Sequence, residues 1–123
     1  MRITREAFQM LVSEALDELP AEFAHRLENV EVLVEDEPSP QHLGSRTLEP
    51  GHLLLGLYHG VPLTHRSVFS SGMMPERITI FQRPVEAISH TPHEIIENVR
   101  RTVLHEIAHH FGISDARLRE LGY

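Results

Sequence analysis

The chain has 123 residues, of which 41% are hydrophobic and 24% charged, so one folded domain is expected over residues 1–123. It contains no cysteine, which excludes disulfides, thiolate metal sites and cysteine nucleophiles. Acidic residues outnumber basic ones by 18 to 11, and the net charge of −7 argues against a nucleic-acid-binding surface. No apolar run approaches the ~20 residues of a membrane span and no secretory leader is evident, so a cytoplasmic protein is expected.

The N-terminal part of the chain predicts two helices followed by a strand. Thr4 can cap a first helix, whose apolar residues recur at helical spacing as far as Leu19. Pro20 can begin a short second helix, and the alternation in VEVLVE, residues 30–35, predicts a strand. Residues 36–50 contain three prolines and a glycine and are predicted to form a loop.

The middle of the chain predicts two further strands, separated by a stretch rich in residues that break regular structure. The apolar run LLLGLY, residues 53–58, suits a buried strand. Residues 60–75 carry glycine, proline and serine, and allow a short strand at residues 66–69. Ile78 and Ile80 alternate with polar residues in RITIFQ, which predicts another strand.

The C-terminal part of the chain predicts a long, well-capped helix over residues 91–111. Thr91 stands at the N-cap position, a proline follows it, and Glu94 completes a capping box. Apolar residues then follow at helical spacing to the end of the segment. Gly112 is expected to end the helix in the left-handed conformation, and Ser114 can cap a last short helix through residue 121.

The end of the long helix carries HEIAHHFGISD, residues 105–115, which has the form H-E-x-x-H-x-x-G-x-x-D. On a helix, His105 and His109 lie on one face, one turn apart, where a single metal ion can take both imidazoles. Glu106 stands beside the first histidine and can hold a water bound to the same metal. Two histidines four residues apart, with a glutamate directly after the first, form the zinc-hydrolase motif.

Asp115 is the candidate third metal ligand. In a straight helix it would lie ~9 Å beyond His109, at 1.5 Å per residue, whereas zinc ligands lie ~2 Å from the ion. Gly112 breaks the helix between them and lets the chain fold back. His105, His109 and Asp115 would then hold one Zn²⁺ and leave a fourth position for water, as in catalytic zinc sites. The alternative is that Asp115 is only a first-turn acid favoured by the helix dipole.

The motif resembles that of zincin metallopeptidases with aspartate as third ligand, the snapalysin type. From LLGLYHGVPL through RITIFQRP to the motif helix, the chain resembles the small bacterial minimal zincins. The resemblance implies an α+β fold, in which a small mixed sheet of three to four strands packs on an N-terminal helix and on the active-site helix. It also implies one zinc ion at His105, His109 and Asp115, Glu106 as general base, and a peptide or protein substrate along an edge strand. Eight residues follow Asp115 and none is methionine, so the Met-turn of the larger metzincins is missing.

A zinc-dependent metallopeptidase is therefore the leading interpretation. Stabilising the oxyanion needs a further donor, for which the candidates are Tyr58, His59, His110 and Tyr123. A non-catalytic zinc-binding or interaction module that kept the site for stability is a second interpretation. A metal-dependent RNA hydrolase is a third; related endonucleases have three histidines and lack a glutamate after the first, so Glu106 and the acidic charge argue against it. Substrate identity and oligomeric state stay open.

Overall fold

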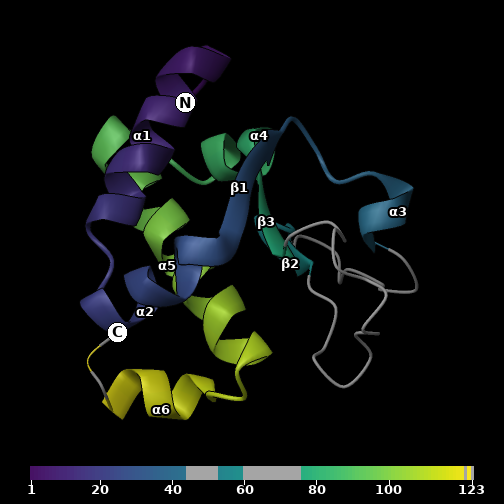
Figure 1. Cartoon of the computed structure of the whole chain (residues 1–123). Coiled ribbons are helices and arrows are strands. Elements are labelled where there is room, and N and C mark those ends of the chain that lie inside the picture. The colour runs from purple at the N-terminus through teal and green to yellow at the C-terminus, as the bar shows by residue number, and fades with distance from the viewer. Residues whose placement is uncertain (44–52, 60–75, 121, 123) are drawn as a thin grey trace.

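The structure is a computed structural model that describes residues 1–43, 53–59, 76–120 and 122. In chain order its elements are α1 (Arg5–Asp17), α2 (Ala21–Arg26), the 3₁₀ turn η1 (Leu27–Asn29), β1 (Val30–Glu35), α3 (Pro40–Leu43), β2 (Gly56–His59), β3 (Glu76–Phe81), α4 (Gln82–Ala87), α5 (Pro92–His110) and α6 (Asp115–Glu120) (Figure 1). None of the described helices is long and apolar enough to cross a membrane.

The described strands form one mixed three-stranded sheet in the order β1-β3-β2. β1 runs parallel to β3, and β2 runs antiparallel to it. The register places Val32 opposite Ile78 and Ile78 opposite Tyr58, so these side chains share one face of the sheet. The α+β fold with a small mixed sheet is therefore confirmed.

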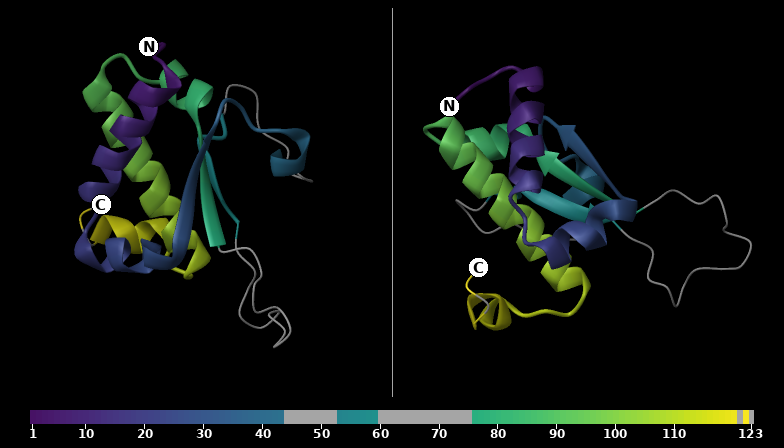
Figure 2. Two further views of the ribbon diagram at one scale, coloured as in Figure 1. Left: turned by 45° about the horizontal axis from the view of Figure 1, so that its top comes forward. Right: turned by 60° about the vertical axis from the view of Figure 1, so that its left-hand side comes forward.

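Helices α1 and α5 pack together on one face of the sheet (Figure 2). Thr4 caps α1 as expected, because its Oγ1 accepts a hydrogen bond from Ala7 N at 3.1 Å. The core is built from apolar residues of both helices and the strands; its largest fully buried members include Phe8, Phe23, Ile78, Ile80, Ile95, Ile107 and Leu118. The helical spacing of apolar residues in the sequence thus corresponds to the buried faces of α1 and α5.

Local structure differs from the sequence-based expectation at three places. The strand expected at residues 53–58 begins only at Gly56. Just before it, the Leu55 carbonyl accepts a hydrogen bond from Phe81 N at 2.9 Å. The predicted loop at residues 36–50 contains the single-turn helix α3, which starts at Pro40. The expected strand RITIFQ leads directly into helix α4, which was not predicted because six residues are too few for a clear helical period. The strand allowed at residues 66–69 lies outside the described residues.

A buried carboxylate, Glu86, ties α4 to the start of the chain. It accepts hydrogen bonds from Ile3 N at 2.9 Å, Gln82 Nε2 at 3.1 Å and Arg83 Nη1 at 2.8 Å. Burial alone would raise the pKa of this carboxyl, but the three donors outweigh it and hold the pKa below its ordinary value. This network attaches α4 to the N-terminal residues, a contact that the sequence pattern did not reveal.

Candidate metal and catalytic site

Helix α5 presents the two motif histidines on its partly exposed side. Thr91 Oγ1 accepts a hydrogen bond from Glu94 N at 3.1 Å, so the expected cap sets the start of the helix. One face of α5 is buried along its length by Ile95, Ile96, Val99, Val103, Leu104, Ile107 and Ala108. His105 and His109 lie away from that face, with ring centroids 6.2 Å apart and ring planes at 47°. The helix therefore brings both imidazoles to one side, as the spacing predicts.

The chain reverses direction directly after α5. Gly112 has a φ of +76°, and Ile113 N donates to Ala108 O at 2.7 Å while Gly112 N donates to His109 O at 3.2 Å. These two bonds make a Schellman motif, which requires a left-handed residue that glycine supplies without strain. Helix α6 then starts at Asp115, close to the end of α5 (Figure 2). The role expected of Gly112 as a helix break is thus present in the structure.

Two contacts hold α6 in place behind the turn. Ser114 Oγ accepts a hydrogen bond from Arg117 N at 3.1 Å and so caps the helix, as the sequence predicts. Leu118, one turn further on, is fully buried in the core. Because its first residue is fixed by a cap and its middle by an apolar anchor, α6 presents Asp115 to α5 from a defined position.

The reversal places the Asp115 carboxylate against both histidines. Asp115 Oδ1 lies 3.1 Å from His109 Nε2 and 3.9 Å from His105 Nδ1. Two ligands of a tetrahedral zinc ion, each ~2.0–2.2 Å from the metal, lie about 3.3 Å apart. The His109–Asp115 distance is close to this separation, and the His105–Asp115 distance exceeds it. In the described part of the chain, no three such side chains already surround a common metal position.

The donor set nevertheless fits a zinc ion by its chemistry and proximity. Two imidazole nitrogens and one carboxylate oxygen are ligands that zinc accepts, and three protein ligands leave a fourth position open. The three side chains are partly exposed, so their rings and carboxylate can turn without disturbing the core. Asp115 would lie ~9 Å beyond His109 in a straight helix, and the Gly112 turn removes that separation.

Glu106 lies on the side of α5 that faces β2. An added Cβ at Gly56 would come within 2.7 Å of Thr102 Cγ2, so β2 approaches α5 closely at that residue. Further along, the Tyr58 ring stacks on the His110 ring, with centroids 4.1 Å apart and planes at 26°. Thr102, Glu106 and His110 follow one another at intervals of four and share one line along the helix. The two contacts bracket Glu106 and place it next to the strand.

The other candidate residues have different surroundings. The Tyr58 hydroxyl donates to the Glu76 carboxylate at the start of β3. His110 is exposed, and in addition to its stack on Tyr58 it meets Phe111 edge to face, with centroids 5.0 Å apart. His59 ends β2, half-buried, and pairs in register with Arg77. Tyr123 lies outside the described residues.

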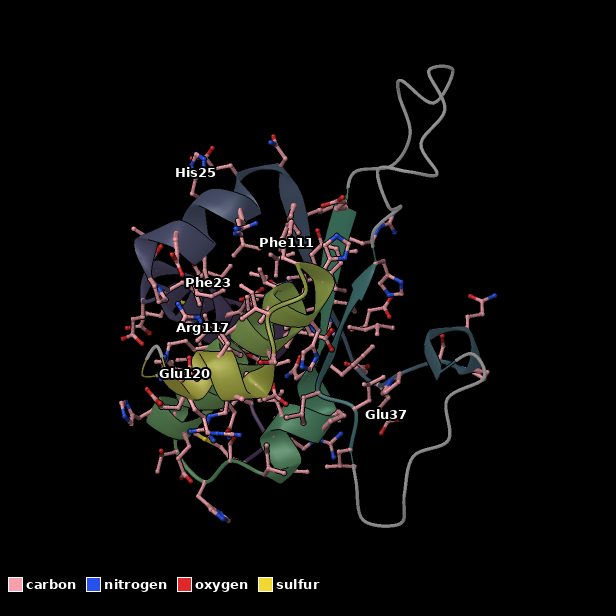
Figure 3. All side chains as sticks on the ribbon, turned by 90° about the horizontal axis from the view of Figure 1, so that it is seen from below. Phe23, His25, Glu37, Phe111, Arg117 and Glu120 are labelled. Carbon is pink, nitrogen blue, oxygen red and sulfur yellow. The ribbon has the colours of Figure 1, made fainter. Side chains whose placement is uncertain are left out.

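Arg26 was not singled out by the sequence, although it contacts the end of the motif helix. Its guanidinium carbon lies 4.3 Å from the centroid of the Phe111 ring. Figure 3 looks onto this end of the molecule, where Phe111 is labelled at the end of α5 and His25 marks the neighbouring α2. No local sequence signal links α2 to the motif, because the contact joins segments far apart in the chain.

Comparisons with known proteins bear on the fold and the family of the chain. No curated protein matches the chain. Among solved structures, a conserved hypothetical protein from Thermo thermophilus is similar in fold, with a TM-score of 0.55 and 27% identity over 89% of this chain and 94% of that one. The family model described as zincin-like metallopeptidase matches residues 27–123, well over half of the chain. The chain therefore belongs to the zincin-like metallopeptidase family.

Proposed function

We propose that the protein is a zinc-dependent metallopeptidase with His105, His109 and Asp115 as zinc ligands. The observation that carries the proposal is the return of Asp115 to within 3.1 Å of His109 Nε2 through the Gly112 turn. A purely structural first-turn acid at the start of α6 has no need to lie against both motif histidines. Membership of the zincin-like family supports the same assignment.

When bound, zinc would supply Lewis-acid polarisation of the scissile carbonyl and lower the pKa of a coordinated water. The chain's own contribution is to hold two imidazole nitrogens and one carboxylate close together and to leave the opposite side open. His105, His109 and Asp115 are all partly exposed, so this side is accessible to a substrate.

Glu106 is the proposed general base. Glu106 directly follows the first proposed ligand on α5, and the helical spacing puts the residue on the β2 side of the helix, between Thr102 and His110. From there it can accept a proton from the attacking water and pass it to the leaving amine of the cleaved peptide bond. Donation to the amine is needed because an unprotonated amide nitrogen is a poor leaving group.

The substrate is proposed to be an extended peptide that lies along the β2 side of the sheet. β2 is the outermost of the three described strands on the side that packs on α5. A main chain aligned with this strand would run beside α5 past Glu106, next to the proposed zinc ligands. Peptide recognition by an extended strand relies on main-chain hydrogen bonds, which suits a peptidase of broad sequence preference.

His110 is the proposed donor to the oxyanion. The Tyr58 hydroxyl is engaged by the Glu76 carboxylate, whereas the His110 ring is exposed and directly follows the ligand His109. A single well-placed donor to the oxyanion contributes about 100- to 1,000-fold to kcat. Replacing His110 with phenylalanine should keep the stack on Tyr58 and lower kcat by a factor of that order.

The decisive experiment compares the native chain with Glu106→Gln after zinc loading. Zinc content is measured by metal analysis, and cleavage is measured on a peptide library by mass spectrometry. We expect one zinc per chain in both proteins, with cleavage by the native chain alone. Glu97→Gln is the matched control, because Glu97 lies on the same helix and pairs with Arg100 at 3.0 Å, away from the motif.

The outcomes separate the candidate functions. Zinc in both proteins without cleavage of any library peptide would favour a zinc-binding or interaction module over a peptidase. Cleavage that persists at the native rate in Glu106→Gln would remove Glu106 from the mechanism. Zinc binding that is unchanged in Asp115→Ala would show that the third ligand is not Asp115.

A further inference from the structure

Four planar groups form a continuous row across the end of α5. The Arg26 guanidinium lies 4.3 Å from the Phe111 centroid, Phe111 meets His110 edge to face at 5.0 Å, and His110 stacks on Tyr58 at 4.1 Å. We call Arg26, Phe111, His110 and Tyr58 the planar row. It extends from α2 on one side of the helix end to β2 on the other.

The row holds the part of the chain on which the Asp115 return depends. His110 is the last residue of α5 and Phe111 is its C-cap, so the two central groups lie between the ligand His109 and the Gly112 turn. Both side chains are exposed, and Phe111 keeps 43% of its surface accessible. The apolar core holds the preceding Ile107 and Ala108, whereas the exposed side chains of His110 and Phe111 are held by the contacts with Tyr58 and Arg26.

Each contact in the row has a favourable geometry. A guanidinium over an aromatic face within ~6 Å is attracted by the ring quadrupole, and offset-stacked or edge-to-face rings are the preferred aromatic arrangements. Tyr58 is itself held at its far end, because its hydroxyl donates to Glu76 on β3. The row is thus anchored in the sheet at one end and in α2 at the other.

We propose that the planar row positions the zinc ligands by fixing the last turn of α5. When this turn is fixed, the Gly112 turn keeps its position relative to His109. That position brings Asp115 back to the two histidines. Arg26, Phe111 and Tyr58 are accordingly positioning residues that act through the backbone of α5. The inference rests on the proposed zinc site and goes beyond it by naming residues that set its geometry from outside the motif.

Arg26 gives the sharpest test, because two explanations predict opposite signs. If Arg26 influenced zinc only through its charge, removing a cation from this end of the molecule would tighten the binding of a dication. If Arg26 holds Phe111 in place, Arg26→Ala should weaken zinc binding by about fivefold to tenfold. Arg119→Ala is the matched control, since it removes the same charge from an exposed side chain of α6 and leaves the row intact.

The experiment measures zinc affinity by competition with a chromophoric chelator for the native chain and each variant. Thermal unfolding of the metal-free proteins is measured in parallel, and the Co²⁺-substituted proteins give visible absorption bands that report ligand geometry. Phe111→Leu should weaken zinc binding at least as much as Arg26→Ala does. The double variant should bind zinc no more weakly than Phe111→Leu alone, because both changes remove the same Arg26–Phe111 contact. Tyr58→Phe keeps the stacked ring but loses the hydroxyl bond to Glu76, so it should weaken zinc binding less than Tyr58→Leu, which removes the stack as well.

Each result decides a different point. Weaker zinc binding and altered Co²⁺ bands in Arg26→Ala, with metal-free melting close to that of Arg119→Ala, support the proposal. Native affinity and native Co²⁺ bands in Arg26→Ala and Phe111→Leu would overturn it and leave the proposed function intact. Zinc binding without peptide cleavage by the native chain would overturn the proposed peptidase function and leave the proposed role of the planar row intact. Failure of the native chain to bind zinc would overturn both.

Discussion

The close approach of β2 to α5 makes Gly56→Ala the most informative single substitution. The new Cβ would lie 2.7 Å from Thr102 Cγ2 and 3.2 Å from the backbone oxygen of Thr79. Carbon atoms in proteins pack at about 3.5–4.0 Å, so β2 or the helix would have to move by close to 1 Å. Thr102 cannot turn away freely, because its Oγ1 donates to Asn98 O at 2.7 Å.

The expected loss of stability in Gly56→Ala can be set by comparison with overpacked sites in other proteins. Inserting a methyl group into a well-packed site destabilises proteins by typically 1–3 kcal/mol, and the short contact with Thr102 argues for about 2 kcal/mol. For a chain of this size such a loss lowers Tm by roughly 6–10 °C. Because Glu106 lies one turn after Thr102, the same displacement should also lower kcat/KM for peptide cleavage.

Chemical and thermal unfolding of Gly56→Ala, Thr102→Ser and the double variant form a complete cycle. Thr102→Ser removes only the Cγ2 methyl group and keeps the hydroxyl that bonds to Asn98. The double variant should therefore recover most of the stability lost in Gly56→Ala, with a coupling energy of about 1 kcal/mol or more. Native stability in Gly56→Ala, or a double variant in which the two losses simply add, would refute the close packing of β2 on α5.

Three further predictions concern the turn, the last helix and the buried acid. Gly112→Ala should lower the free energy of unfolding by about 1–2 kcal/mol, measured by thermal unfolding. An added Cβ would meet nothing within 4 Å, so the whole cost comes from the left-handed backbone. Gly112→Asn should cost less, because asparagine adopts this conformation more easily. Ser114→Ala should cost ~1 kcal/mol and speed amide exchange at Arg117, whose N–H it leaves uncapped; unchanged exchange would contradict the cap. The Glu86 pKa is lowered in the folded state, so its stabilisation is present above the unfolded pKa of about 4.3 and is lost as the pH falls through the lowered value. Glu86→Gln should therefore flatten the decline of stability below about pH 4.3, and an unaltered pH profile would refute this.

The sequence predicted most reliably those features whose signals are local. The start of α5 is encoded by Thr91 and Glu94, and its end by Gly112, within a few residues of the structure they define. The placement of Asp115 followed from simple geometry, since only a chain reversal could bring it back. Its role as a zinc ligand, and those of His105 and His109, stay predictions for the experiments above.

Features that depend on distant segments could not be predicted. Gly56 lies so close to Thr102 that a side chain at this position would clash, and nothing in a run of leucines reveals this contact. Helix α4 is tied to the start of the chain by Glu86, which accepts a hydrogen bond from Ile3 N. The contact of Arg26 with Phe111 likewise joins two segments that share no motif.

The short span of the candidate ligands has a consequence for folding. His105, His109 and Asp115 all fall within residues 105–115, so bringing them together closes only a small loop and costs little chain entropy. Under the proposed function, an unfolded chain can therefore keep part of the zinc affinity through this segment alone. A ligand that binds both the folded and the unfolded chain stabilises the folded state only by the difference between its two binding free energies. Zinc should thus raise Tm by less than its affinity implies, whereas a peptide bound along β2 requires the assembled sheet and should contribute its full binding energy to the folded state.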